Sequence, residues 1–499
     1  MLSLIFLIVY FAVMIGIGFY CRNTTKDVNG FVLGGRSVGP WLTAFAYGTS
    51  YFSAVIFIGY AGQFGWQYGI ASTWIGVGNA VLGSLLAWMV LGKRTRIMTQ
   101  HLGSATMPQY FGSRFNSKSL KISSSVIIFV FLIPYTASLY NGLSRLFEMA
   151  FNIDYSVCII IMAVLTAIYV IVGGYMATAI NDFIQGLIML VGIVAVVIAV
   201  LMSHGGLTEA VNKLALVSDS SAGIEQGSLA SIFGPDPLSL FFVIILTSLG
   251  TWGLPQMVQK FYAIKNVSAI KKGTVISTVF ALVVAGGCYF LGGFGRLYSD
   301  QIDIAADGYD AIVPTMISNL APILIALVVV LVLSASMSTL SSLVITSSST
   351  ITIDLVKDSM VKDMSDKKQV SLIRVLIVIF IAISSVIALI QHHSSVTFIA
   401  QLMGISWGAL AGAFLAPYLY SLFWKRTTKQ ACVASFIFGV GFMLFNMFGS
   451  SILPPILKSP INCGVIAMLA GLVIVPIVSL LSPKPDEDEM NKIFSCFKK

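Results

Sequence analysis

Hydroxyl side chains are concentrated in one stretch of this 499-residue chain, SASMSTLSSLVITSSS at 334–349. Ser334, Ser338, Ser341 and Ser342 recur at spacings of three and four, which puts them on one face of a helix. Hydroxyl and carbonyl oxygens are the ligands that a small, hard cation prefers. The stretch therefore predicts a cation site made of neutral oxygens. The alternative is that the serine hydroxyls bond back to carbonyls of the preceding turn.

Asp182 is a second candidate for chemistry. It stands at the start of the apolar run 183–203, whereas the other acidic residues fall in predicted loops, in the tail or at outer ends of helices. A carboxylate near membrane depth is a functional candidate. The alternative is an acid in the first turn of a helix, facing the helix dipole and water.

The composition places these residues in a membrane protein. Hydrophobic residues make up 57% of the chain, charged residues only 10%, and the mean hydropathy is +0.93. A soluble domain carries about a quarter charged residues, and a helix needs about 20 apolar residues to cross a bilayer. We therefore predict an all-α polytopic membrane protein with 13 transmembrane helices, at 2–20, 41–64, 72–92, 119–147, 156–173, 183–203, 237–258, 273–294, 319–348, 372–391, 398–423, 431–447 and 461–482.

Lysine and arginine indicate how these spans are oriented. Of the 29 such residues, 25 fall on one side, in the segments 21–40, 93–121, 259–272, 349–374, 424–430 and 483–499. Short loops rich in Lys and Arg stay in the cytoplasm. We therefore expect a multi-pass protein of the cell (inner) membrane with its N-terminus outside and its C-terminus cytoplasmic. The net charge of +9 reflects this topology and does not indicate a nucleic acid partner.

Two predicted spans are interrupted at their centres. The span 41–64 contains Gly48-Thr49-Ser50-Tyr51, and the span 237–258 contains Gly250, Gly253 and Pro255. Non-helical backbone at membrane depth survives only where it is buried or lines a site. Broken helices at matching places in two halves indicate a transporter built from inverted repeats. The alternative is that the small residues only allow close helix packing.

The two interrupted spans lie five helices apart, which predicts the organisation of the chain. The predicted units are a leading transmembrane helix and first cytoplasmic loop at 1–40, a first five-helix repeat at 41–203, an extracellular loop at 204–236, a second five-helix repeat at 237–423, two trailing transmembrane helices at 424–482 and a cytoplasmic tail at 483–499.

Three stretches resemble the sodium/solute symporter family, and within it the proline and pantothenate branch. They are FVLGGRSVGP at 31–40, IYVIVGGYMATAINDFIQG at 168–186 and SASMSTLSSLVITSSSTITIDL at 334–355. The resemblance implies a LeuT-like 5+5 inverted-repeat core with one leading and two trailing helices. It also implies a sodium-coupled symporter that imports a small organic solute by alternating access. The solute would be a monocarboxylate such as pantothenate or an amino acid such as proline.

The same resemblance implies where sodium, the expected cofactor and the only expected metal, would bind. The first site would use the carbonyls of Thr49, Phe52 and Ala335 with the hydroxyls of Ser338 and Thr339. A second site, present in some members of the family, would use Asp182, Ser338, Ser341 and Ser342.

Solute contacts are expected at both interruptions and on the third core helix. The matching positions are Tyr51, Ser53, Gly59, Tyr135, Thr247, Thr251, Trp252 and Pro255. Tyr51 stands where the proline transporters carry an aspartate, which slightly favours the pantothenate type. The alternative for each aromatic residue is packing or anchoring at the membrane interface.

Other classes of function fit the sequence less well. The chain has no HExxH motif and no carboxylate pair or histidine cluster at membrane depth, so we expect no enzyme activity and no catalytic residues. A transporter-like sensor, a channel without coupled uptake, and proton-coupled uptake of a sugar or other neutral solute remain alternatives. We expect a monomer in the lipid bilayer whose partners are sodium and the solute.

Overall fold

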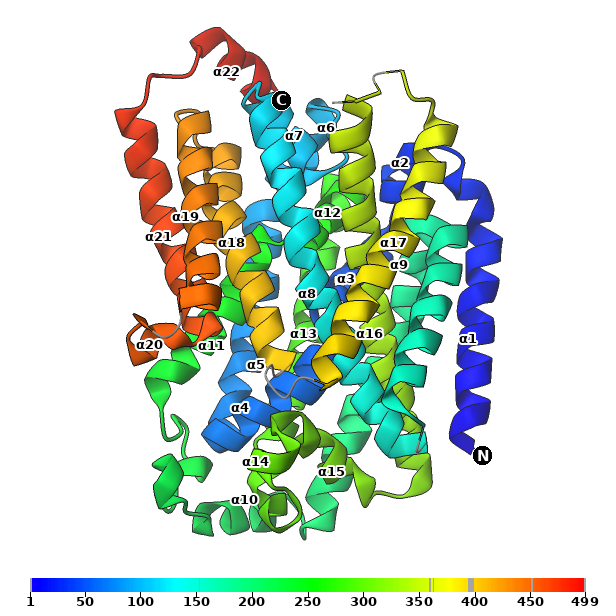
Figure 1. Cartoon of the computed structure of the whole chain (residues 1–499), viewed down its shortest axis with the longest axis vertical. Coiled ribbons are helices and arrows are strands. Elements are labelled where there is room, and N and C mark those ends of the chain that lie inside the picture. Colours follow the sequence, from blue (N-terminus) through cyan, green and yellow to red (C-terminus); the bar gives the residue numbers. More distant parts are fainter. Residues whose placement is uncertain are drawn as a thin grey trace.

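The structure is a computed structural model that describes residues 2–151, 153–358, 360–361, 363–393, 399–449 and 452–497. Long helices lie roughly along the long axis of the molecule and form one bundle (Figure 1). Within the described residues, β structure is limited to two isolated bridges, Val38 with Ile264 and Asp219 with Ile224. The all-α fold class is therefore confirmed.

The elements that build the bundle are α1 (Leu2–Tyr20), α3 (Pro40–Tyr51), α4 (Ala61–Tyr68), α5 (Thr73–Gly78), α8 (Lys118–Phe151), α9 (Tyr155–Ser203), α11 (Pro237–Leu249), α12 (Pro255–Ala263), α13 (Val267–Gly292), α16 (Pro322–Thr350), α17 (Asp366–His393), α18 (Ile399–Phe423), α19 (Lys429–Gly449) and α21 (Pro460–Leu481). Shorter helices lie between them or near their ends: α2 (Val28–Leu33), α6 (Lys93–His101), α7 (Met107–Arg114), α10 (Leu207–Leu216), α14 (Ile304–Asp307), α15 (Ile312–Ser318), α20 (Pro455–Lys458) and α22 (Glu487–Phe494).

The number of membrane spans differs from the prediction. Within the described residues, ten helical stretches are long and apolar enough to cross a membrane, or eleven if the bent pair of α11 and α12 counts as one span. The predicted number of 13 is therefore not confirmed. Two of the ten, Val55–His101 and Tyr155–Ser203, are 47 and 49 residues long, whereas one crossing needs about 20. Gly69 and Gly174 have positive φ angles of 60° and 55° inside them, so a glycine interrupts each stretch.

The first predicted interruption is confirmed. Helix α3 ends at Tyr51, and a π-helical turn begins at Val55. Phe52 caps α3 with extended backbone angles (φ −104°, ψ 97°), and its amide donates to Gly48 O at 3.0 Å. The chain therefore leaves the helical path at Phe52 and Ser53, in the middle of the predicted span.

The second predicted interruption is also confirmed. Helix α11 ends at Leu249, a 3-10 turn spans Gly250–Gly253, and Leu254 is extended. Pro255 then opens α12, a position where its missing amide hydrogen costs no helical hydrogen bond. The two halves meet at an angle of 48°.

The two broken helices lie at the centre of the bundle. Helix α3 contacts α9, α12 and α16, and α16 also contacts α9 and α12. Outside this group, α1 packs on α9, while α19 and α21 pack on α18. Val191, Ile437 and Val473 on these outer surfaces are more than half exposed. Exposed apolar side chains of this kind suit contact with lipid.

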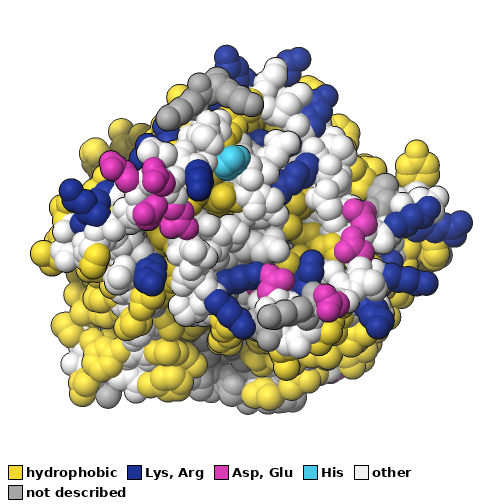
Figure 2. Space-filling model, turned by 90° about the horizontal axis from the view of Figure 1, so that it is seen from above, with side chains coloured by type: hydrophobic (Ala, Val, Ile, Leu, Met, Phe, Trp, Pro, Cys, Tyr) yellow, Lys and Arg dark blue, Asp and Glu magenta, His cyan; other side chains and the backbone are white. Residues whose placement is uncertain are grey.

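The end of the bundle where the C-terminus lies is rich in basic side chains (Figure 2). The first and last described residues lie at opposite ends (Figure 1). Many Lys and Arg side chains surround the end where the C-terminus lies, with a few groups of Asp and Glu among them (Figure 2). Helices α10, α14 and α15 lie at the other end (Figure 1). Which end faces the cytoplasm stays a prediction.

Candidate functional site

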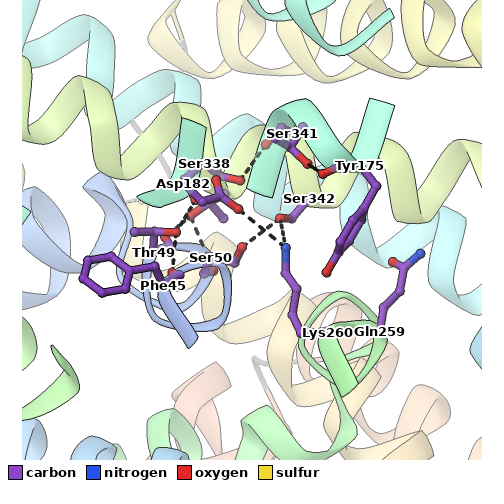
Figure 3. Close-up of polar contacts among 12 residues, drawn as sticks. Phe45, Thr49, Ser50, Tyr175, Asp182, Gln259, Lys260, Ser338, Ser341 and Ser342 are labelled. Carbon is purple, nitrogen blue, oxygen red and sulfur yellow. Dashed lines mark hydrogen bonds and ion pairs between the residues drawn. The ribbon is translucent and has the colours of Figure 1, made fainter. Parts of the chain in front are cut away.

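Helix α16 is joined to the end of α3 by hydroxyl groups. The Ser338 hydroxyl donates to Thr49 Oγ1 at 2.7 Å, and the Thr49 hydroxyl donates to Phe45 O at 2.8 Å. The Thr339 hydroxyl lies 3.2 Å from Thr49 O and 3.1 Å from Ala335 O, both as acceptors. Figure 3 shows Thr49 and Ser338 pointing toward each other from their two helices. The first break therefore lies directly against the hydroxyl-rich face of α16.

The structure brings four of the five residues of the predicted first sodium site together. Thr49, Ser338 and Thr339 are fully buried, and Ala335 is 1% exposed. The fifth, Phe52, lies at the end of the same helix in the non-helical segment. These groups offer buried, neutral hydroxyl and carbonyl oxygens, which are the ligand atoms that a sodium ion prefers. The donor set fits sodium, and the assignment itself stays a prediction.

The residues of the predicted second site also lie near one another, but a cation of the protein lies among them. Lys260 Nζ on α12 donates to Ser342 Oγ at 2.8 Å and lies 3.8 Å from Asp182 Oδ2. The Ser342 hydroxyl is 2.7 Å from Ser50 Oγ on α3. The Ser341 hydroxyl bonds back to Ser338 O at 2.8 Å, as the packing interpretation expects. The close-up in Figure 3 shows the Lys260 ammonium directed between Asp182 and Ser342.

Two expectations about charged residues are wrong. Lys260 was expected in the cytoplasmic segment 259–272, but it lies in α12 with its side chain 2% exposed. Asp354 was expected in the cytoplasmic segment 349–374, in contact with solvent, but it is fully buried and accepts a hydrogen bond of 2.7 Å from the Thr106 hydroxyl. In both cases the helical segment continues beyond the predicted end of the span, and the charged residue on it is buried.

Tyr51, one of the residues proposed for solute contact, links the two broken helices. The Tyr51 hydroxyl on α3 donates to Thr247 O on α11. The Trp252 indole donates to Leu82 O at 2.9 Å, and the Thr251 hydroxyl donates to Ser248 O at 2.9 Å. The bond from Tyr51 to Thr247 therefore links the two broken helices directly. Two further predicted residues lie apart from these bonds: Gly59 in the π-helical turn and Pro255 at the start of α12.

A group of buried polar atoms near Tyr51 makes no close hydrogen bond within the described part of the chain. It comprises Ser53 Oγ, Tyr135 Oη and Trp407 Nε1. Tyr135 meets Trp407 edge to face with 5.9 Å between ring centroids, and Trp407 lies 6.1 Å from the Tyr51 ring. Buried polar atoms are nearly always hydrogen-bonded, so these three are candidates to bind a polar ligand. Trp407, on α18, was missed by the sequence analysis.

Broken helices that meet a hydroxyl-rich helix at the centre of a membrane bundle define a secondary transporter of the LeuT-like class. Comparison with known proteins gives the family: the sequence profile of the sodium:solute symporter family matches residues 31–439. The chain belongs to the sodium:solute symporter family. It is therefore a polytopic membrane protein of a family of sodium-coupled solute transporters, and its relatives are transporters and not enzymes.

Two curated relatives and two solved structures are similar to the chain over nearly its whole length. The osmoregulated proline transporter OpuE of Bacillus subtilis is 29% identical over 96% of this chain and 94% of its own length. A sodium/proline symporter of Staphylococcus aureus is 29% identical over 98% and 95%. A Na+-coupled sialic acid symporter superposes with a TM-score of 0.77 at 18% identity, covering 98% of this chain and 99% of that one. A manganese transporter of Eremococcus coleocola gives a TM-score of 0.54 at 12% identity, covering 91% and 95%.

These comparisons also correct one sequence-based preference. Tyr51, in place of an aspartate, slightly favoured the pantothenate type. The two curated relatives are both proline transporters, so this preference is not supported. The solved structures, at 18% and 12% identity, support the fold alone.

Proposed function

We propose that the protein imports proline, or an amino acid of similar size and charge, together with sodium. The two curated relatives named above transport proline and cover almost the whole chain. An amino acid zwitterion needs an apolar wall for its carbon skeleton and polar groups for its two charges. The aromatic rings of Tyr51, Tyr135 and Trp407 and the buried polar atoms beside them suit such a solute.

The observation that carries this proposal is the junction between Thr49 and the pair Ser338 and Thr339. It joins the broken end of α3 to α16 through hydrogen bonds of hydroxyl groups. A bound sodium ion would replace these hydrogen bonds, and the same oxygen atoms would then be its ligands. Sodium bound here would hold the break in one conformation. The same break carries Tyr51, so ordering it would also order the solute site.

The coupling then follows from thermodynamics. If sodium raises the affinity for the solute by some factor, the solute raises the affinity for sodium by the same factor. Sodium would enter from outside with the solute, and both would leave to the cytoplasm, where sodium is scarce. We place the basic end of the bundle in the cytoplasm, because Lys and Arg favour that side. The division into two five-helix repeats and a monomeric transport unit are part of this proposal.

Uptake into proteoliposomes tests the proposal. Purified protein would be given radiolabelled proline under an inward sodium gradient, an equal potassium gradient or a proton gradient. Unlabelled pantothenate, other amino acids, short monocarboxylates and sugars would be added as competitors. We expect concentrative proline uptake only with sodium, inhibited by amino acids close to proline in size. Uptake that proceeds equally with a proton gradient, or that pantothenate inhibits while amino acids close to proline in size do not, would contradict it.

A further inference from the structure

Lys260 lies where a second sodium ion would be expected. Its ammonium group hydrogen-bonds Ser342 Oγ at 2.8 Å and faces Asp182 Oδ2 at 3.8 Å. Asp182 and Ser342 are two of the four residues that the family resemblance implies for a second ion. The side chains of Lys260 and Asp182 are 2% and 1% exposed, so neither charge is screened by water.

The charges at this place are already balanced. An unpaired buried charge is very unfavourable, whereas a buried pair with hydrogen bonds is tolerated. Lys260 is the cation paired with the Asp182 carboxylate. A sodium ion bound to Asp182 would bring a second cation against the same carboxylate. Like charges at such short range in a place without water repel strongly.

We propose that the Lys260 ammonium takes the place of a second sodium ion, so that the protein binds one sodium ion per cycle at the Thr49 and Ser338 junction. This inference rests on the proposed function, because it assumes that sodium binds at that junction. Lys260 also connects the two broken helices, since Ser342 contacts Ser50 on α3 while Lys260 itself belongs to α12. A tethered ammonium would therefore hold α3, α12 and α16 together without an exchangeable ion.

Counting bound ions tests the inference without relying on transport. Equilibrium binding of radioactive 22Na+ to the purified full chain would be measured in the absence of solute. We expect one ion per protein for the parent and for Lys260→Arg, which keeps a cation. Lys260→Met frees Asp182 and should bind two ions, and Lys260→Met combined with Asp182→Asn should return to one. Lys265→Met, which removes an exposed lysine just after the same helix, should bind one.

The outcomes separate this inference from the proposed function. No sodium bound to the parent would overturn both. Two ions bound to the parent, or one ion bound to folded Lys260→Met, would overturn only the inference. If Lys260→Met does not fold, Asp182→Asn in the parent gives a second test. It should still bind one ion, and the loss of an ion in that variant would overturn the proposal.

Discussion

The hydroxyl of Ser338 donates a hydrogen bond of 2.7 Å to the hydroxyl of Thr49 across 289 positions of the sequence. Ser338 belongs to the continuous helix α16, and Thr49 lies three residues before the break in α3. A change in this contact therefore acts on the broken end of α3, and it acts from α16, a helix without a break. This relationship is the physical basis of the coupling proposed above.

The link between the two breaks should be sensitive to one hydroxyl. Tyr51→Phe removes the donor to Thr247 O and leaves that buried carbonyl without this partner. An unsatisfied buried group costs about 1–3 kcal/mol, and each 1.4 kcal/mol is about tenfold in affinity. Without the bond the free protein relaxes, and proline must restore the ordered arrangement on binding. We therefore expect the dissociation constant for proline, measured by isothermal titration with saturating sodium, to rise about fivefold or more.

Tyr140→Phe is the matched control for that change. Tyr140 is a fully buried tyrosine on α8, and among the described residues its hydroxyl makes no hydrogen bond to either broken helix. It should leave the dissociation constant for proline close to that of the parent. Equal effects of the two changes would show that the Tyr51 hydroxyl has no special role.

Close packing of α13 against α4 should depend on one glycine. A methyl group at Gly292 would stand 1.9 Å from Ala61 O and 2.6 Å from Ala61 C, both backbone atoms. Overpacking of this kind costs typically about 1–3 kcal/mol, and occasionally more. Gly292→Ala should therefore lower the melting temperature or the yield of folded protein, measured by fluorescence-detected size exclusion after heating.

Gly286→Ala in the same helix provides the control. A methyl group there meets no atom within 4 Å, and alanine is favoured over glycine in helix interiors by about 1 kcal/mol. The melting temperature should stay the same or rise slightly. A loss as large as that of Gly292→Ala would refute the packing argument.

The ion pair between Asp219 and Arg296 should anchor the loop 204–236, and its contribution to stability should depend on pH. Asp219 accepts a hydrogen bond of 3.0 Å from Arg296 Nη1 and one of 2.6 Å from the Ser221 hydroxyl. The Ser221 hydroxyl and then the Arg296 guanidinium hold the pKa of the Asp219 carboxyl below its usual range. A lowered pKa means that this stabilisation is present above the usual value of about 4 and is lost as the pH falls through the lowered one.

Asp219→Asn should therefore lower the melting temperature at pH 7, and the difference from the parent should shrink as the pH falls below about 4. Thermal unfolding between pH 7 and pH 3 measures both effects. Glu225→Gln removes an exposed carboxylate from the same loop and should have little effect. A difference between Asp219→Asn and the parent that is independent of pH would rule out the carboxylate as its cause.

Local chemistry made much of the central architecture predictable. Gly250, Gly253 and Pro255 interrupt a helix by their own backbone preferences, so the second break could be located from the sequence. The spacing of Ser338 and Ser342 places them on one face whatever surrounds the helix. The resemblance to the symporter family then related these residues to Thr49 in a distant part of the chain, and the structure brings them into contact or close to it.

Long-range packing accounts for what the sequence did not reveal. Lys260 precedes three lysines, at 265, 271 and 272, and therefore looked like part of a charged loop. Its burial depends on where α12 lies relative to α3 and α16, which no local pattern specifies. Trp407 was missed because one aromatic residue in an apolar span carries no local signal, although its ring lies 6.1 Å from that of Tyr51 and 5.9 Å from that of Tyr135.

The central claim is that sodium at the Thr49 and Ser338 junction raises the affinity for the solute. The most direct test is the dissociation constant for proline, measured by isothermal titration at a series of sodium concentrations. The parent and the double variant Ser338→Ala/Thr339→Ala would be compared. The double variant Ser347→Ala/Ser348→Ala would serve as the control, because these buried hydroxyls on the same helix have no partner among the described residues.

We expect the affinity for proline to rise with sodium in the parent and in the control, and to be independent of sodium in Ser338→Ala/Thr339→Ala. An affinity that still rises with sodium in that variant would contradict the account, because sodium would then act from somewhere else.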